Sequence, residues 1–339
     1  MSLPRLYQLG VLSVFTLICC AFIPTDQQET PPIMLDNIHY FVNDPKAAKD
    51  FFVKHFQAKP LARPDKNPLS FIDYLEVRPE QASIAISPRG PYQGMYMQED
   101  PIRWKRTSVK VSAKTPPTYG VHWLALRTES IKYSLKSLEA QGIKVISTEV
   151  DIPGESSKAA MIWGPEYTRI VIIQRNRERS QETLYGIDHV MLLVENLEKN
   201  INFFKDVYNG EILKRNNLYC KMKVGDHILI MAVPEALNIP SNTVHKMDTM
   251  QFRPGIEQIG FLYKDPQPAY QAAAIKGYEF NLRPSRLIYR NKPTPYITAI
   301  THSPEGIYCE MYAEDGREGP RTVYINQPSE TMSGNKKDK

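Results

Sequence analysis

Glu310 is the side chain whose setting most strongly predicts chemistry in this chain of 339 residues. It lies between Tyr308 and Cys309 on one side and Met311 and Tyr312 on the other, in a run with the pattern of a core strand. A carboxylate in such a place is costly unless it is paired or bound to a metal ion. The sequence therefore predicts that Glu310 has a partner, and a cation is the partner that would support catalysis.

Other chemically active side chains lie in the β-rich runs that precede Glu310. His302 and Tyr296 could act as acid/base groups toward a substrate, and Arg283 and Arg286 could hold its anionic part. Two more imidazoles, His39 and His122, lie in strand-like runs. We interpret these two as core or edge histidines.

Several classes of function are excluded by composition and motifs. The chain has 42 Lys+Arg and 37 Asp+Glu, a net charge of +5, and part of the surplus is in the tail, so nucleic acid is not an expected partner. Four cysteines, two of them adjacent in an apolar stretch, exclude a disulfide scaffold. Phosphate-binding loops, dinucleotide fingerprints, nucleophile elbows and HExxH zinc helices are absent from the sequence.

The first residues have the pattern of an export signal. Arg5 precedes an apolar run at 9–23, which is short for a membrane span and is followed by the polar PTDQQETPP. We predict a signal peptide over 1–28 and an exported protein, periplasmic, secreted or lipid-anchored. The sequence Leu17-Ile18-Cys19-Cys20 loosely resembles a lipobox, and an uncleaved anchor is the alternative. Membrane contact is expected only through this segment or a lipid.

Four segments of the remaining chain have the same order of predicted elements: a strand, a helix, then more strands. They begin with LDNIHYFVND at Leu35, GVHWLALRTES at Gly120, GIDHVMLLVEN at Gly186 and GIEQIGFLYKD at Gly255. In the third, apolar residues at helical spacing predict a helix over 197–208, stopped by Asn209-Gly210, and strands at 211–215, 218–224 and 227–233. Each unit is therefore predicted to be βαβββ, in an α+β fold.

The spacing of the units predicts the domain organisation. The polar NRERSQET separates the second unit from the third, which predicts domains at 33–175 and 185–315 with a linker at 176–184. Past Asp315 the composition becomes polar and rich in Gly, Ser and Lys. We therefore expect residues 316–339 to be disordered.

The repeats resemble the vicinal oxygen chelate superfamily, which includes glyoxalase I, extradiol dioxygenases and bleomycin resistance proteins. The resemblance rests on Gly186-Ile187-Asp188-His189-Val190 and on the turn and strand SPEGIYCEM that contains Glu310. It implies that pairs of units close curved sheets around a metal ion bound by first and last strands. Four units imply two such domains, the layout of two-domain extradiol dioxygenases.

The resemblance also implies which positions would bind the ion. Its first-strand position is occupied by Asn37, Trp123, His189 and Gln258, and its last-strand position by Val171 in the second unit, about Leu229 in the third and Glu310 in the fourth. The N-terminal domain is therefore expected to be non-catalytic. The C-terminal domain is expected to bind Fe, Mn, Zn or Ni through His189, Gln258 and Glu310. A strand-end histidine and a satisfied amide are the alternatives for His189 and Gln258.

The resemblance implies three functions. The first is a metal-dependent enzyme, like an extradiol dioxygenase in layout, that chelates a small oxygen-bearing substrate. The second is a glyoxalase- or epimerase-like lyase or isomerase, because Gln258 stands where the ring-cleaving enzymes have a second histidine. The third is a metal-free protein that binds a small molecule in its cleft.

Overall fold

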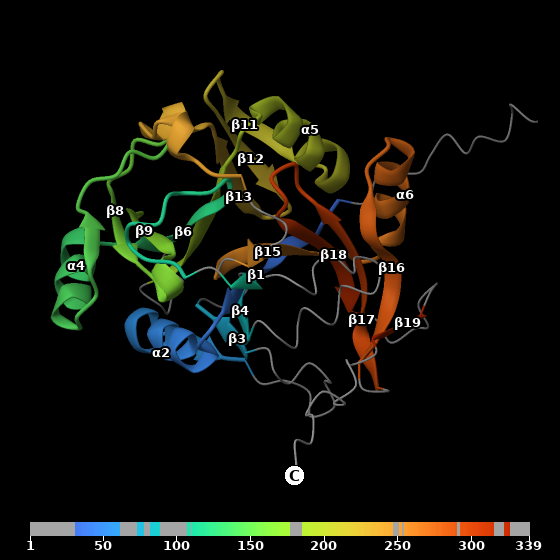
Figure 1. Ribbon diagram of the computed structural model, residues 1–339, viewed down its shortest axis with the longest axis horizontal. Coiled ribbons are helices and arrows are strands. Elements are labelled where there is room, and N and C mark those ends of the chain that lie inside the picture. Colours follow the sequence, from blue (N-terminus) through green and yellow to red (C-terminus); the bar gives the residue numbers. More distant parts are fainter. Residues whose placement is uncertain are drawn as a thin grey trace, which may run out of the picture.

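The computed structural model describes residues 31–61, 73–77, 82–88, 107–108, 110–176, 185–246, 251–252, 254–289, 292–314 and 322–325. Within these ranges the chain forms a nine-stranded sheet, an eight-stranded sheet and a short pair of strands, with helices against the two large sheets (Figure 1). The predicted signal segment lies outside the described residues. In the described part, no helix has the length and apolar character needed to cross a membrane.

All four predicted units are present as βαβββ, which confirms the α+β fold class. The first two units comprise β1 (Met34–Val42), α2 (Pro45–Phe56), β2 (Lys59–Pro60), β3 (Asp73–Glu76) and β4 (Ser83–Pro88), then β6 (Gly120–Thr128), α4 (Ile131–Ala140), β7 (Val145–Ser147), β8 (Ala159–Trp163), the 3-10 turn η2 (Pro165–Tyr167) and β9 (Arg169–Gln174). The last two comprise β10 (Gly186–Leu193), α5 (Leu197–Tyr208), β11 (Glu211–Arg215), β12 (Tyr219–Val224) and β13 (His227–Ala232), then β15 (Gly255–Leu262), α6 (Gln267–Ile275), β16 (Phe280–Tyr289), β17 (Lys292–His302) and β18 (Tyr308–Glu314).

Side-chain caps fix where three of the helices begin. Asp44, Ser130 and Asn196 each accept a hydrogen bond from the backbone N–H three residues later, at the starts of α2, α4 and α5. Such caps satisfy an N–H group that would otherwise lack an acceptor. Helix α5 ends at Asn209, which adopts the left-handed conformation at φ 51°.

The pairing of the units differs from the sequence prediction. Strand β1 pairs with β15, so the first and fourth units share the nine-stranded sheet, and β6 pairs with β10, so the second and third share the other. Figure 1 shows the blue strands of the first unit beside the orange strands of the fourth. The division at 176–184 separates the second unit from the third in sequence but not in space, since each sheet takes one unit from either side of it.

A further difference concerns the predicted disordered tail. Residues Thr322–Ile325 form a strand, β19, that pairs in parallel with β16 at the edge of the nine-stranded sheet. An edge strand has a row of unpaired backbone N–H and C=O groups that can pair with another extended segment. This pairing does not depend on side-chain composition, on which the prediction of disorder was based. Disorder from residue 316 onward is therefore wrong for these four residues.

The two faces of each sheet have different roles. One face packs against the helices, and its side chains join a single core that runs through both sheets, with Phe52 and Phe204 among its helical members. We call the opposite face the inner face. In the eight-stranded sheet the inner face is mainly apolar, with Trp123, Met191 and Ile230 in a second core cluster. In the nine-stranded sheet it carries polar residues, described below.

A β-bulge occurs at the same place in the first strand of every unit. The register shifts at Asp36, His122, Asp188 and Glu257, each one residue before the predicted ligand position. A bulge inserts one extra residue and so changes which face the following side chains occupy. The bulge therefore turns the next residue, Gln258 in the fourth unit, toward the inner face.

Two glutamates in equivalent turns join the sheets. Glu305, before β18, accepts hydrogen bonds from the Glu195 backbone N–H (2.9 Å) and from Asn200 Nδ2 (2.9 Å) at the start of α5. Glu166, before β9, accepts bonds from the Asn43 backbone and side chain near the start of α2. Each bond connects a last strand in one sheet to a helix of the other.

Replacing Glu305 with alanine should therefore loosen the contact between the sheets. The variant loses two hydrogen bonds, and the one from the buried Asn200 is partly shielded from solvent. We expect the free energy of unfolding to fall by about 1–3 kcal/mol, measured by urea denaturation. The matched change Glu166→Ala, whose bonds are both exposed, should cost less. Equal losses for the two variants would contradict this role for Glu305.

Candidate functional site

The polar inner face of the nine-stranded sheet brings together one row of side chains from β18, β15 and β1. Glu310 pairs in register with Gly260, and Gly260 pairs with Asn37. One row along, Tyr308 pairs with Gln258, and Gln258 pairs with His39. Partners in adjacent strands face the same side of a sheet, so these side chains share the inner face.

Glu310 and Gln258 lie in direct contact, as the predicted site requires. Gln258 Nε2 donates to Glu310 Oε2 at 2.7 Å, and Thr298 Oγ1 donates to Glu310 Oε1 at 3.2 Å. Both side chains are almost fully buried, with 7% of Glu310 and 1% of Gln258 exposed. The prediction that the buried Glu310 has a partner is confirmed, because its carboxylate is hydrogen-bonded on both oxygens. Cys309 and Met311, on either side of Glu310 in the strand, face the helix-side core.

Asn37 adds an amide to this face, and the absence of a side chain at Gly260 leaves the space that this amide occupies. A β-carbon at Gly260 would overlap the Asn37 amide, so glycine makes room for Asn37 to lie over β15. Among the described residues, none provides a hydrogen-bond partner for the buried Asn37 Oδ1. A buried oxygen of this kind needs a ligand, an ion or water to offset its lost hydration.

His39 is the imidazole of this face. Its Nε2 lies 2.8 Å from Ser87 Oγ, and its ring stacks on Phe41 with centroids 4.5 Å apart. Only 1% of the side chain is exposed. His39 is buried, which agrees with its interpretation as a core histidine. Its place on the inner face, directly opposite Gln258, was not predicted from the sequence.

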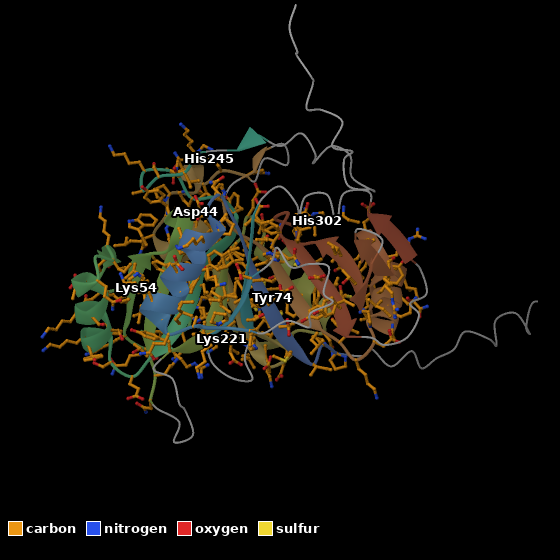
Figure 2. All side chains as sticks on the ribbon, turned by 90° about the horizontal axis from the view of Figure 1, so that it is seen from below. Asp44, Lys54, Tyr74, Lys221, His245 and His302 are labelled. Carbon is orange, nitrogen blue, oxygen red and sulfur yellow. The ribbon has the colours of Figure 1, made fainter. Side chains whose placement is uncertain are left out.

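The predicted substrate groups lie on the neighbouring strands. Tyr296 and His302, on β17, pair with Glu314 and Tyr308 and so share the face of Glu310. The His302 and Tyr308 rings lie 4.5 Å apart, and Figure 2 shows His302 among the strands of the fourth unit. Their acid/base roles stay predictions. Of the two arginines on β16, Arg283 is exposed and Arg286 half-buried, and their role as anion-holding groups also stays a prediction.

His189 lies in the other sheet, where its ring is fully engaged. Nδ1 lies 2.8 Å from Asp188 Oδ1, and Nε2 accepts a hydrogen bond from the Trp123 indole N–H at 3.1 Å. An imidazole binds a metal through the lone pair of a ring nitrogen. In His189, Nδ1 is engaged by Asp188 and the lone pair of Nε2 by the Trp123 indole, so neither nitrogen is left for an ion. The prediction that His189 shares an ion with Gln258 and Glu310 is therefore wrong, because these residues occupy different sheets.

The last strands of the eight-stranded sheet add no metal donors. Val171 lies on the inner face as predicted, but in the third unit the matching residue is Ile230, since Leu229 faces the helix-side core. Both Val171 and Ile230 are fully buried and apolar. With Trp123 covering His189, this face does not fit a metal ion.

An ion on the nine-stranded sheet would need amide oxygens. In the ranges that the structure describes, no three side chains of His, Cys, Asp or Glu are grouped so that they could hold a metal. Asn37, Gln258 and Glu310 instead offer two amides and a carboxylate, a hard oxygen set that suits Mn²⁺ or Mg²⁺ better than softer ions. The buried Asn37 Oδ1, which has no hydrogen-bond partner among the described residues, is the observation that supports binding of an ion by these three side chains.

Part of the chain matches a known family in sequence. Residues 34–165 match the sequence model of the Glyoxalase/Bleomycin resistance protein/Dioxygenase superfamily. No curated protein matches the chain by sequence.

Solved structures extend the likeness to the whole fold. Maize (Zea mays) glyoxalase I is similar with a TM-score of 0.60 and 15% identity, over 83% of this chain and 92% of that one. A point mutant of the same maize enzyme gives 0.61 and 16%, over 83% and 94%. A proposed dioxygenase from Bacillus subtilis gives 0.57 and 12%, over 84% and 86%. Residues 34–165 therefore match this superfamily in sequence, and the solved structures share the four-unit fold over most of the chain.

Proposed function

We propose that this protein is a metal-dependent enzyme with one working site, on the inner face of the nine-stranded sheet. Asn37, Gln258 and Glu310 would hold a divalent ion there, and a small oxygen-bearing substrate would bind it. The observation that carries the proposal is the buried Asn37 Oδ1 beside the Gln258–Glu310 pair. The eight-stranded sheet would serve as a structural partner, because its equivalent face is filled by Trp123 and apolar side chains.

The donor set favours a lyase or isomerase over a ring-cleaving dioxygenase. Non-haem iron oxygenases typically use two histidines and one carboxylate, and this set has no histidine ligand. A hard divalent ion bound here would supply Lewis acidity, which polarises a substrate carbonyl or diol oxygen.

The protein's own residues would then position the substrate and move a proton. His302 lies on the face of Glu310 and is our candidate for the acid/base group, as predicted from sequence. Thr298 holds Glu310 Oε1 and so fixes the orientation of the carboxylate. The rings of Tyr296 and Tyr312, 5.8 Å apart, form an aromatic wall on the same face.

Metal binding and substrate turnover test this function separately. Equilibrium dialysis of the purified protein should show one equivalent of Mn²⁺, and the loaded protein should exchange the α-proton of small hydroxyketones for deuterium, followed by NMR. Oxygen consumption with catechol would instead support the dioxygenase. A protein that binds none of Mn, Fe, Zn, Ni or Mg would reject both enzymes and leave the metal-free binding protein.

A further inference from the structure

A cavity lies where the two sheets meet, and Glu310 is not among the residues that line it. Its volume is about 80 Å³, and its walls come from the segment 111–119, from β6, β8, η2 and β9 of one sheet, and from the first residues of β15 of the other. One water needs about 10–15 Å³ by this measure, so the cavity holds roughly six waters. A ligand with a similar number of non-hydrogen atoms would fill it.

The charged side chains of the lining are Arg169 and two glutamates, the buried Glu257 and the half-buried Glu166, whose two oxygens accept hydrogen bonds from Asn43. The Arg169 guanidinium lies over the Trp163 ring, 5.6 Å from its centroid. Glu257, the bulge residue of β15, lines the cavity with 6% of its surface exposed. Burial, and secondarily the charge of Arg169, lower the pKa of His122 to about 3, so this third polar group is neutral at pH 7. With Glu166 held by Asn43, the lining therefore offers a ligand one cation, Arg169, one buried anion, Glu257, and the rings of Trp163 and Tyr167.

One wall is built from strained backbone. Glu166 and Tyr167 are consecutive non-glycine residues in the left-handed region, at φ 52° and 57°. Such conformations cost about 1–3 kcal/mol each and persist where surrounding contacts hold them. Here Glu166 is held by Asn43, and the turn places the half-exposed Tyr167 ring edge-on against Trp163, with centroids 5.8 Å apart. The strain fixes an aromatic side chain at the mouth of the cavity.

We propose that this cavity binds a small zwitterionic α-amino acid. Its carboxylate would meet Arg169, its ammonium group Glu257, and its side chain the Trp163 and Tyr167 rings. A ligand with only one charge would be attracted by one lining group and repelled by the other. Because Glu257 directly precedes Gln258, the bound ligand would contact the strand that carries the proposed metal donor.

Tryptophan fluorescence of the metal-free protein tests the proposal independently of the proposed enzyme. The chain has three tryptophans, and two of them, Trp123 and Trp163, line the cavity. Titration with L-alanine should change the emission and saturate. Propionate, which lacks the ammonium group, and ethylamine, which lacks the carboxylate, should bind at least ten-fold more weakly. Trp163→Phe should remove most of the change.

Charge variants complete the test. Arg169→Gln should weaken L-alanine binding at least ten-fold, whereas Lys136→Gln, which removes an exposed charge on α4, should leave it unchanged. If Arg169→Gln does not fold, Glu257→Gln carries the same expectation. Propionate binding as tightly as L-alanine, or no fluorescence change at millimolar L-alanine, would overturn the proposal.

Discussion

The change Glu310→Gln is expected to reduce the affinity for Mn²⁺ at least 100-fold, whereas His189→Gln is expected to leave it unchanged. Glu310 is the single carboxylate among the three proposed donors, and a neutral amide is a much weaker ligand for a hard cation. His189 lies in the other sheet with both ring nitrogens engaged. Isothermal titration of the metal-free variants with Mn²⁺ measures both affinities.

The pair of variants separates two accounts of the site. If the ion were held by His189, Gln258 and Glu310, as the sequence alone indicates, both changes would abolish binding. Urea denaturation provides the control, because each variant must unfold as cooperatively as the wild-type protein before its affinity is compared. Loss of Mn²⁺ binding in His189→Gln with the fold intact would contradict the arrangement described here.

The sequence was sufficient to predict the units but not how they pair. Local signals set each unit: the helix over 197–208 is the observed α5, and the strand at 211–215 is the observed β11. Pairing depends on contacts between residues far apart in the chain, such as Asn37 with Gly260. The four first strands have nearly the same apolar pattern, so the pattern alone favours no pairing over another.

The error in pairing explains the error in the site. The four first-strand positions are structurally equivalent, since Asn37, Trp123, His189 and Gln258 each follow a bulge in the corresponding strand. Consecutive units were expected to share a sheet, which grouped His189 with Gln258 and set Asn37 aside. With the first and fourth units paired, Asn37 takes the place that His189 was given. Gln258 and Glu310 were brought together correctly because both lie in one unit.

The largest stability effect is expected at Asp188, beside the histidine that does not bind metal. The Asp188 side chain is only 8% exposed, and it accepts hydrogen bonds from Arg175 Nε (2.9 Å) and Nη2 (3.0 Å) as well as contacting His189. Burial alone would raise the pKa of Asp188, but the hydrogen bonds from His189 and Arg175 outweigh it and hold this pKa well below its usual range. The carboxylate is thus strongly stabilised in its charged form.

Asp188→Ala is expected to lower the free energy of unfolding by about 3 kcal/mol at pH 7, the low end for breaking a buried ion pair. The low end applies because Arg175 is 28% exposed and keeps Glu155 as a partner. Asp188→Asn, which keeps an acceptor for His189 but not the charge, should lose less. Urea denaturation measures all three proteins.

The pH dependence of this difference identifies its cause. A carboxylate whose pKa is lower in the folded state stabilises the fold above its unfolded pKa of about 3.9, and that stabilisation is lost as pH falls toward the folded value. The gap between wild type and Asp188→Ala should therefore be constant from pH 7 to 5 and shrink below about pH 4. A gap that stays the same down to pH 3 would show that Asp188 acts through packing, and the charge network around Arg175 would lose its assigned role. A shrinking gap would instead show that Asp188 stabilises the fold through its charge, as its hydrogen bonds with Arg175 and His189 indicate.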